Sequence, residues 1–237
     1  MTMEPVVLTN PEGPVRIRLD AGAAAEYLVL QDGTGASGAS AADFEIALAA
    51  SASLNLVFLS LGGDVQNRLR VTLSGPQADC RLGGLSLADG RQEMACDIVL
   101  THAVPQCRST QLFKNIVGGQ AVTRFNGLIK VVQDAQQTEA YQANHNLLAS
   151  ATAKAYTRPQ LEIYADDVKC SHGATIGRLN PDELFYMRSR GIPQAEARLL
   201  QQLAFCYEVL ALISSAPLRE KMQLRVENRL RQLESDC

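Results

Sequence analysis

The stretch Leu69-Arg70-Val71-Thr72-Leu73-Ser74-Gly75-Pro76-Gln77-Ala78 contains the pattern that decides the fold. A short run of β-forming residues is followed by a turn signal, because serine, glycine and proline favour tight turns over regular structure. A small polar residue and an alanine then precede the next apolar run. Short apolar runs separated by such turns predict a mainly β chain.

The same unit recurs along the chain up to about residue 177. A turn residue or small polar residue stands before an alanine at Gly22-Ala23, Ser51-Ala52, Gln77-Ala78, Gln120-Ala121 and Thr152-Ala153. The spacing is loose, roughly 25–45 residues, which is the range of solenoids and propellers. Small residues at recurrent corners favour a β-helix, in which each coil turns sharply and stacks on the previous one. A β-sandwich with irregular hairpins is the alternative.

The sequence becomes helical near Leu179. Asn180 is a suitable N-cap, Pro181 fits the first helical position, Glu183 completes the pattern of a capping box, and Gly191 fits the end of the helix. We therefore predict a β-helix core domain over residues 1–178 and a helical domain over 179–237.

Two further helices are expected in this C-terminal part. The second follows Pro193, and its predicted apolar face contains Ala197, Leu200, Leu203, Ala204, Tyr207, Leu210 and Leu212. The third begins at Pro217 and contains Met222, Val226, Leu230 and Leu233, with charges of both signs between them. Such charges usually form a solvated face. The helices would cap the solenoid or form a docking surface for a partner.

Composition excludes several classes of protein. The chain has 237 residues, a formal net charge of −3 and a hydrophobic content of 46%. The basic patch typical of nucleic-acid binding is therefore not expected. The six cysteines are irregularly spaced without a CxxC pair, which does not resemble a disulfide framework. No apolar run approaches the ~18 residues of a membrane span. We expect a cytoplasmic protein with reduced thiols.

One glycine-rich motif needs a separate interpretation. Residues 33–38 match the pattern GxGxxG after an apolar run. A dinucleotide-binding unit requires alternating strands and helices, whereas residues 51–177 are predicted to form almost only strands. We therefore interpret the motif as a loop of small residues between coils. The sequence has no GxxxxGK[ST] phosphate loop, so the chain is not expected to hydrolyse ATP itself.

Cys170 and His172 form the most informative pair of polar residues. In a strand, residues i and i+2 point to the same face, so a thiolate and an imidazole would lie side by side. That pair suits zinc or iron, but a tetrahedral metal needs four ligands, and the others would come from elsewhere in the chain or from a partner. A structural pair without a metal is the alternative. His102 and Cys107 form a weaker pair, and His145 fits a packing or hydrogen-bonding role.

The region around this pair resembles the SufB/SufD family of scaffold proteins for iron–sulfur cluster assembly. The resemblance is carried by residues 158–175, 184–192, 125–127, 137–144 and 101–107. The run Lys169-Cys170-Ser171-His172-Gly173-Ala174-Thr175 is similar to SufD, because SufB-type chains have a His-Glu-Ala-Thr stretch where Gly173 stands here. SufD-type chains usually carry a longer N-terminal helical region than this sequence shows.

The resemblance implies a right-handed parallel β-helix with a C-terminal α-helical domain. It also implies a non-catalytic subunit that pairs with a SufB-type subunit and docks a SufC-type ATPase through its helices. The nascent iron–sulfur cluster would form at the interface with the partner, with His172 as first candidate ligand and Cys170 as its neighbour. No cofactor would be tightly bound in the isolated chain, which could pair with itself.

Two other functions remain as alternatives. The chain could be a purely structural partner that organises the complex without a cluster ligand. It could also be a metalloenzyme with zinc bound by cysteine and histidine, although catalytic zinc usually has three protein ligands.

Overall fold

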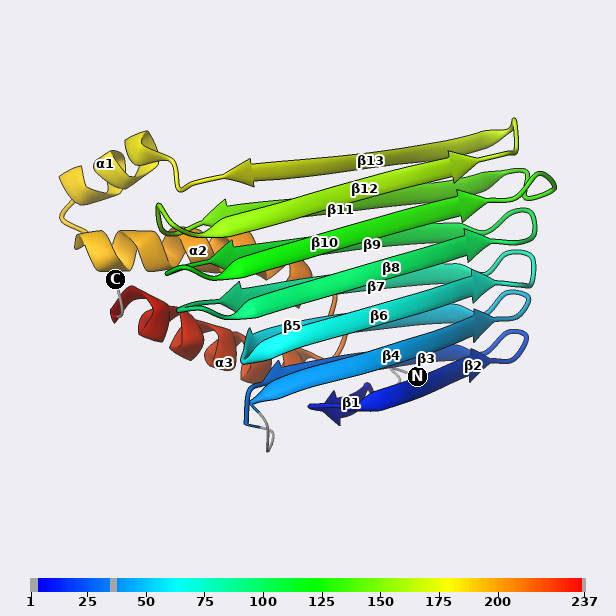
Figure 1. The fold of residues 1–237 in the computed structure, drawn as a ribbon, viewed down its shortest axis with the longest axis horizontal. Coiled ribbons are helices and arrows are strands. Elements are labelled where there is room, and N and C mark those ends of the chain that lie inside the picture. Colours follow the sequence, from blue (N-terminus) through cyan, green and yellow to red (C-terminus); the bar gives the residue numbers. More distant parts are fainter. Residues whose placement is uncertain (1–3, 35–37, 236–237) are drawn as a thin grey trace.

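The computed structural model describes residues 4–34 and 38–235. It is a mainly β protein, a parallel β-solenoid of about six turns followed by three helices (Figure 1). The predicted solenoid is confirmed and the β-sandwich alternative is wrong. The glycine-rich motif falls between two strands of the solenoid, and its residues 35–37 lie outside the described residues.

The strands form two sheets, and within each sheet all neighbouring strands pair in parallel. Sheet A has seven strands in the order β1 (Val6–Thr9), β3 (Ala24–Asp32), β5 (Ser53–Gly62), β7 (Asp79–Ala88), β9 (Arg108–Val117), β11 (Thr138–Leu148) and β13 (Val168–Gly177). Sheet B has six strands, β2 (Gly13–Leu19), β4 (Ala39–Leu48), β6 (Asp64–Leu73), β8 (Glu93–His102), β10 (Val122–Val131) and β12 (Lys154–Ile163).

One column of corners, from sheet B to sheet A, explains the repeat at Gly22-Ala23, Ser51-Ala52 and Gln77-Ala78, whereas Gln120-Ala121 and Thr152-Ala153 lie at the opposite corners. Each corner places a residue in the left-handed region of φ, where glycine is favoured and other residues are uncommon. These residues are Gly22, Ser51, Gln77, Gln106 and Gln137. The next residue opens the following strand on the inner side of the corner and is small: Ala52, Ala78 and Cys107 are completely buried. Small side chains are needed because successive corners stack on one another.

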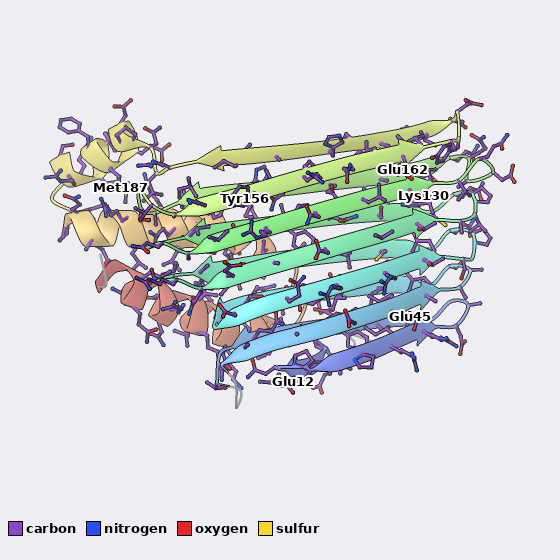
Figure 2. All side chains as sticks on the ribbon, viewed as in Figure 1. Glu12, Glu45, Lys130, Tyr156, Glu162 and Met187 are labelled. Carbon is purple, nitrogen blue, oxygen red and sulfur yellow. The ribbon has the colours of Figure 1, made fainter. Side chains whose placement is uncertain are left out.

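The three helices are α1 (Pro181–Ser189), α2 (Gln194–Leu210) and α3 (Ala216–Ser235). Figure 1 shows α2 and α3 lying behind sheet A, and an apolar cluster joins Val57, Leu59 and Leu85 of the sheet to Val226 and Leu230 of α3. The opposite face of the solenoid, the outer face of sheet B, carries polar side chains such as the labelled Glu45 and Glu162, which are exposed, and Lys130, which is half-buried (Figure 2). Among the helices of the described residues, none combines the length and the apolar content required to span a membrane.

Polar contacts also fix the helices to several coils of sheet A. The Asn55 side chain of β5 donates to the carbonyl of Leu212 at 2.7 Å. The backbone N–H of Ser214 donates to the buried carboxylate of Glu26 in β3 at 2.9 Å. Lys114 of β9, almost fully buried, forms a 2.9 Å ion pair with Glu208 of α2. The helical segment is therefore attached to three strands of sheet A at once, β3, β5 and β9.

The predicted ends of α1 are largely correct. The Asn180 side chain accepts a 2.9 Å hydrogen bond from the backbone N–H of Asp182, Pro181 is the first helical residue, and Gly191 has φ of 87°. The predicted capping box is wrong in one respect. Glu183 accepts a 3.4 Å hydrogen bond from the side chain of Asn180, whereas a capping box uses the backbone N–H.

The predicted apolar face of α2 is partly wrong. Leu200 and Tyr207 are exposed, at 41% and 54%, whereas Leu199, Gln202 and Cys206 are buried. The helix has apolar residues on two adjacent stripes, and packing against sheet A selects the stripe that contains Leu199 and Cys206. The apolar residues expected in the third helix, Met222, Val226, Leu230 and Leu233, lie in α3 and are buried.

Candidate functional site at the open end of the solenoid

The candidate site lies at the end of the solenoid formed by β12 and β13. These strands are the last members of sheets B and A, and no other strand of the described residues pairs with their outer edges. Two apolar side chains are also exposed at this end, Ile163 by 39% and Ile176 by 50%. An unpaired edge with exposed apolar side chains is a surface that can add another strand.

The backbone hydrogen bonds show which residues of β12 face this edge. Lys154 and Tyr164, the latter just after β12, donate their backbone N–H groups to the preceding coil, to Ala121 O and Val131 O, both at 3.0 Å. In a parallel ladder, alternate residues direct both backbone groups to the same neighbour. The intervening residues, among them Thr157 and Leu161, therefore present N–H and C=O groups to the free edge.

The same reasoning applies to β13. The N–H of Glu139 in β11 donates toward β9, to Cys107 O at 3.1 Å, so the alternate residues of β11 bond β13. Because Glu139 is paired with Lys169, the residues of β13 that bond β11 are Lys169 and those in phase with it. The free edge is therefore formed by Cys170, His172, Ala174 and Ile176. These residues also direct their side chains to the interior side of the strand.

Cys170 and His172 thus occupy successive positions on one face of β13 at the open end. Cys170 is half-buried against the inner cluster that contains Ile129, Val131 and Ala140. Burial raises the pKa of the Cys170 thiol, and a backbone hydrogen bond near Ala140 partly opposes this increase. His172 is exposed. One face therefore offers a sulfur and a nitrogen donor next to free backbone groups, whereas their role as ligands stays a prediction.

The strand register shows which residues lie beside Cys170 and His172 in the preceding strands of sheet A. Cys170 lies beside Ala140, and the same row continues to Ser109 and Cys80. His172 lies beside Gln142, whose row continues to Gln111. Gln142 was not identified from the sequence, because its proximity to His172 depends on how β11 and β13 are aligned. The only signal in the sequence is that Gln142 and Asn144 are two positions apart, so in a strand their side chains point to the same face.

The other candidates from the sequence are placed away from this end. His102 is completely buried, and its Nε2 lies 2.9 Å from the hydroxyl of Ser109. Cys107 is also completely buried and donates its thiol to the carbonyl of Gly75 at 3.3 Å. Both residues therefore have structural contacts inside the solenoid. The hydrogen-bonding role predicted for His145 is confirmed, because its Nδ1 lies 2.9 Å from the hydroxyl of Thr175.

The burial of His102 predicts a dependence of stability on pH. Burial lowers the pKa of His102 to about 4, from an ordinary value of 6.5. The unfolded chain binds this proton below pH 6.5 whereas the folded chain does not, so stability is lost as the pH falls from 6.5 towards 4. Between pH 7 and pH 4.5 the loss is expected to be about 2.5 kcal/mol.

Urea denaturation of the wild type and of His102→Gln at both pH values measures this effect. The variant retains a polar side chain but has no imidazole, so the carboxylates titrate equally in both proteins. The wild type is expected to lose about 2.5 kcal/mol more than the variant between the two pH values. Equal losses in the two proteins would show that His102 does not contribute.

Among the described residues, no group of three or more His, Cys, Asp or Glu side chains is arranged to hold a metal ion. Cys80, Cys96, Cys107, Cys170 and Cys206 all have free thiols.

Comparison with known proteins agrees with this architecture. A family model described as the SufBD core domain of the SUF system for FeS cluster assembly matches residues 11–205. The iron–sulfur cluster assembly protein SufD of Escherichia coli (strain K12) is 38% identical over 173 residues, which are 73% of this chain and 41% of that protein. An iron–sulfur cluster assembly SufBD family protein of Synechocystis is 39% identical over 171 residues, 71% of this chain and 37% of its relative. A chloroplastic protein of Arabidopsis thaliana, ABCI7, is 36% identical over 187 residues, which are 76% of this chain and 38% of ABCI7.

The fold defines the chain as a parallel β-solenoid with one helix-covered sheet and an unpaired end. The chain belongs to the SufB/SufD family and is SufD-like within it, as the resemblance in the sequence predicted. It spans less than half of the length of these relatives, 41%, 37% and 38%.

Proposed function

We propose that the chain is a non-catalytic scaffold subunit of an iron–sulfur cluster assembly complex, in which its open end pairs with a SufB-type subunit. The observation that carries this proposal is the position of Cys170 and His172 on the free edge of β13. Their side chains and their unpaired backbone groups face the same way, so strand addition by a partner would bring its residues against them. The nascent cluster is the cargo of this interface.

The ligand count supports a shared site. A thiolate and an imidazole are suitable donors for iron, and an iron ion in a cluster requires more donors than these two. The partner and the sulfide of the cluster would provide the others. The chain would act in the cytoplasm, where thiols such as the free Cys170 stay reduced.

A second surface suits the SufC-type ATPase. Helix α1 has no buried residue, and its aromatic residues Phe185 and Tyr186 are exposed by 72% and 60%. Adjacent exposed aromatics are typical of the central contacts of protein interfaces. In Figure 1, α1 lies beyond the end of β13, separate from the free edge of the solenoid. The ATPase and the SufB-type subunit could therefore bind at the same time.

The test is a co-purification of the chain with SufB-type and SufC-type partners, followed by analysis of iron and sulfide. His172→Ala is expected to lower both by at least about 10-fold, because even the loss of a residue that only supports a ligand weakens metal sites by that much, while the subunits still co-purify. Cys170→Ser should lower them to a smaller extent. His145→Ala is the matched control, because this histidine is on the neighbouring strand and bonds Thr175.

The possible outcomes separate the candidate functions. Normal iron and sulfide in both His172→Ala and Cys170→Ser would contradict a ligand role and leave a purely structural partner. Stoichiometric zinc held tightly by the isolated chain would instead favour a zinc enzyme. A loss of iron in His145→Ala equal to that in His172→Ala would show that the assay reports general disturbance of sheet A.

A further inference from the structure

The interior row of sheet A that ends at His172 changes from apolar to polar just before its end. Paired positions in successive strands hold Tyr27, Leu56 and Leu82, then Gln111, Gln142 and finally His172. Two glutamines inside a solenoid must be desolvated, which is unfavourable unless their amides are hydrogen-bonded. The change from leucine to glutamine therefore needs an explanation.

The hydrogen bonds of Gln142 give its amide a direction. The side chain is 2% exposed, and its Nε2 donates to Oε1 of Gln111 at 2.9 Å. The amide nitrogen is thus used toward β9, whereas the amide oxygen of Gln142 is buried without a hydrogen-bond partner among the described residues. Such an acceptor costs stability unless a donor reaches it. The neighbour of Gln142 on the other side of β11 is His172 of β13.

Gly127 on sheet B holds the amide in place. A Cβ atom at Gly127 would lie 2.8 Å from both Cδ and Oε1 of Gln142, so any larger residue would displace the amide. The Gln142 side chain therefore crosses the interior and rests on the backbone of the opposite sheet. Its orientation is fixed by Gln111 on one side and by Gly127 on the other.

We infer that Gln142 is the positioning residue of His172: when the exposed ring of His172 turns onto it, the amide oxygen of Gln142, which has no partner in the described part of the chain, accepts a hydrogen bond from one ring N–H and thereby directs the other ring nitrogen, with its lone pair, toward the open end. This inference rests on the proposed function, because it explains how a metal ligand would be oriented. Histidines that bind metals usually donate their second N–H to such an acceptor, which fixes the tautomer.

The experiment measures the tautomer of His172 directly. Long-range ¹H–¹⁵N correlation spectra of the labelled full chain, recorded where the ring is neutral, report the ratio of the two N–H tautomers. Gln142→Met keeps the length of the side chain and removes the acceptor, so the ratio is expected to shift at least about fivefold, as one net hydrogen bond would require. Gln142→Glu retains an acceptor oxygen and should preserve the wild-type ratio.

Two further variants keep the result interpretable. Gln111→Met removes the acceptor that orients the Gln142 amide but leaves the Gln142 oxygen in the chain, so the tautomer ratio should shift less than in Gln142→Met. Gly127→Ala displaces the amide without altering Gln142 and should reproduce the shift even if Gln142→Met does not fold. A ratio unaffected by both Gln142→Met and Gly127→Ala, or shifted equally by Gln111→Met, would overturn the inference.

The result is independent of cluster assembly. A tautomer that depends on Gln142, together with normal iron and sulfide in His172→Ala, would refute the ligand role and leave the positioning intact. A tautomer that does not depend on Gln142, together with a loss of iron in His172→Ala, would refute the positioning alone.

Discussion

Gly75→Ala is expected to lower the free energy of unfolding by about 3–5 kcal/mol, near the upper limit for one substitution. A Cβ atom at this position would meet the backbone of the preceding coil, with the Cα of Ala50 only 2.5 Å away. The backbone on both sides is fixed, because the N–H of Gly75 bonds Leu48 O at 3.2 Å and its carbonyl accepts from Cys107. The clash cannot be relieved by rotating a side chain.

Urea denaturation of wild type and variant measures this loss, and Gly173→Ala provides a control. An added Cβ at Gly173 would meet nothing within 4 Å, so that substitution should change stability by less than about 0.5 kcal/mol. Similar stability for Gly75→Ala and Gly173→Ala would mean that neighbouring coils are less closely stacked than the structure shows.

Ala174→Pro is expected to weaken pairing with the SufB-type subunit by more than about 100-fold. The N–H of Ala174 faces the free edge of β13, so proline removes a hydrogen-bond donor from the interface and places its ring there. The loss of such a bond together with the steric conflict is expected to cost about 3 kcal/mol of binding free energy, which corresponds to a change in affinity of about 100-fold. The preceding residue is Gly173, which tolerates the backbone restriction that proline imposes on its neighbour.

Affinity can be measured by titrating the SufB-type subunit into the labelled chain. Ala174→Val is the matched control, because valine adds volume but retains the N–H, and its effect should be much smaller. The unfolding curve of the proline variant alone should stay close to that of the wild type, since no hydrogen bond to β11 is lost. Unchanged affinity in Ala174→Pro would place the interface elsewhere.

The stacking of coils could be predicted because each corner repeats one requirement. The chain must enter the left-handed region of φ and then place a small residue inside the turn, and both demands are visible in Gly22-Ala23, Ser51-Ala52 and Gln77-Ala78. Helix α3 could also be predicted, because only one of its faces is apolar. For α2 the sequence offers two apolar stripes, and the choice depends on the shape of sheet A.

The candidate site could be predicted only as far as local spacing reaches. Cys170 and His172 are two positions apart, and the period of a strand places them on one face. Gln142 is distant in sequence, and only the register of β11 and β13 brings it beside His172. The contact of His102 with Ser109 depends on how β8 and β9 face each other across the interior, and that of Cys107 with Gly75 on a neighbouring coil, so the sequence could not show that these residues are buried.

The attachment of the helices to β3, β5 and β9 has a consequence for folding. In a simple solenoid each coil contacts only its neighbours, and unfolding can proceed one coil at a time. Here a segment that follows the solenoid, and is synthesised after it, secures much earlier coils through Glu26 and Asn55. Until that segment emerges from the ribosome, the apolar outer face of sheet A stays uncovered, so nascent chains are expected to be prone to aggregation. Once complete, the protein should melt as a single cooperative unit.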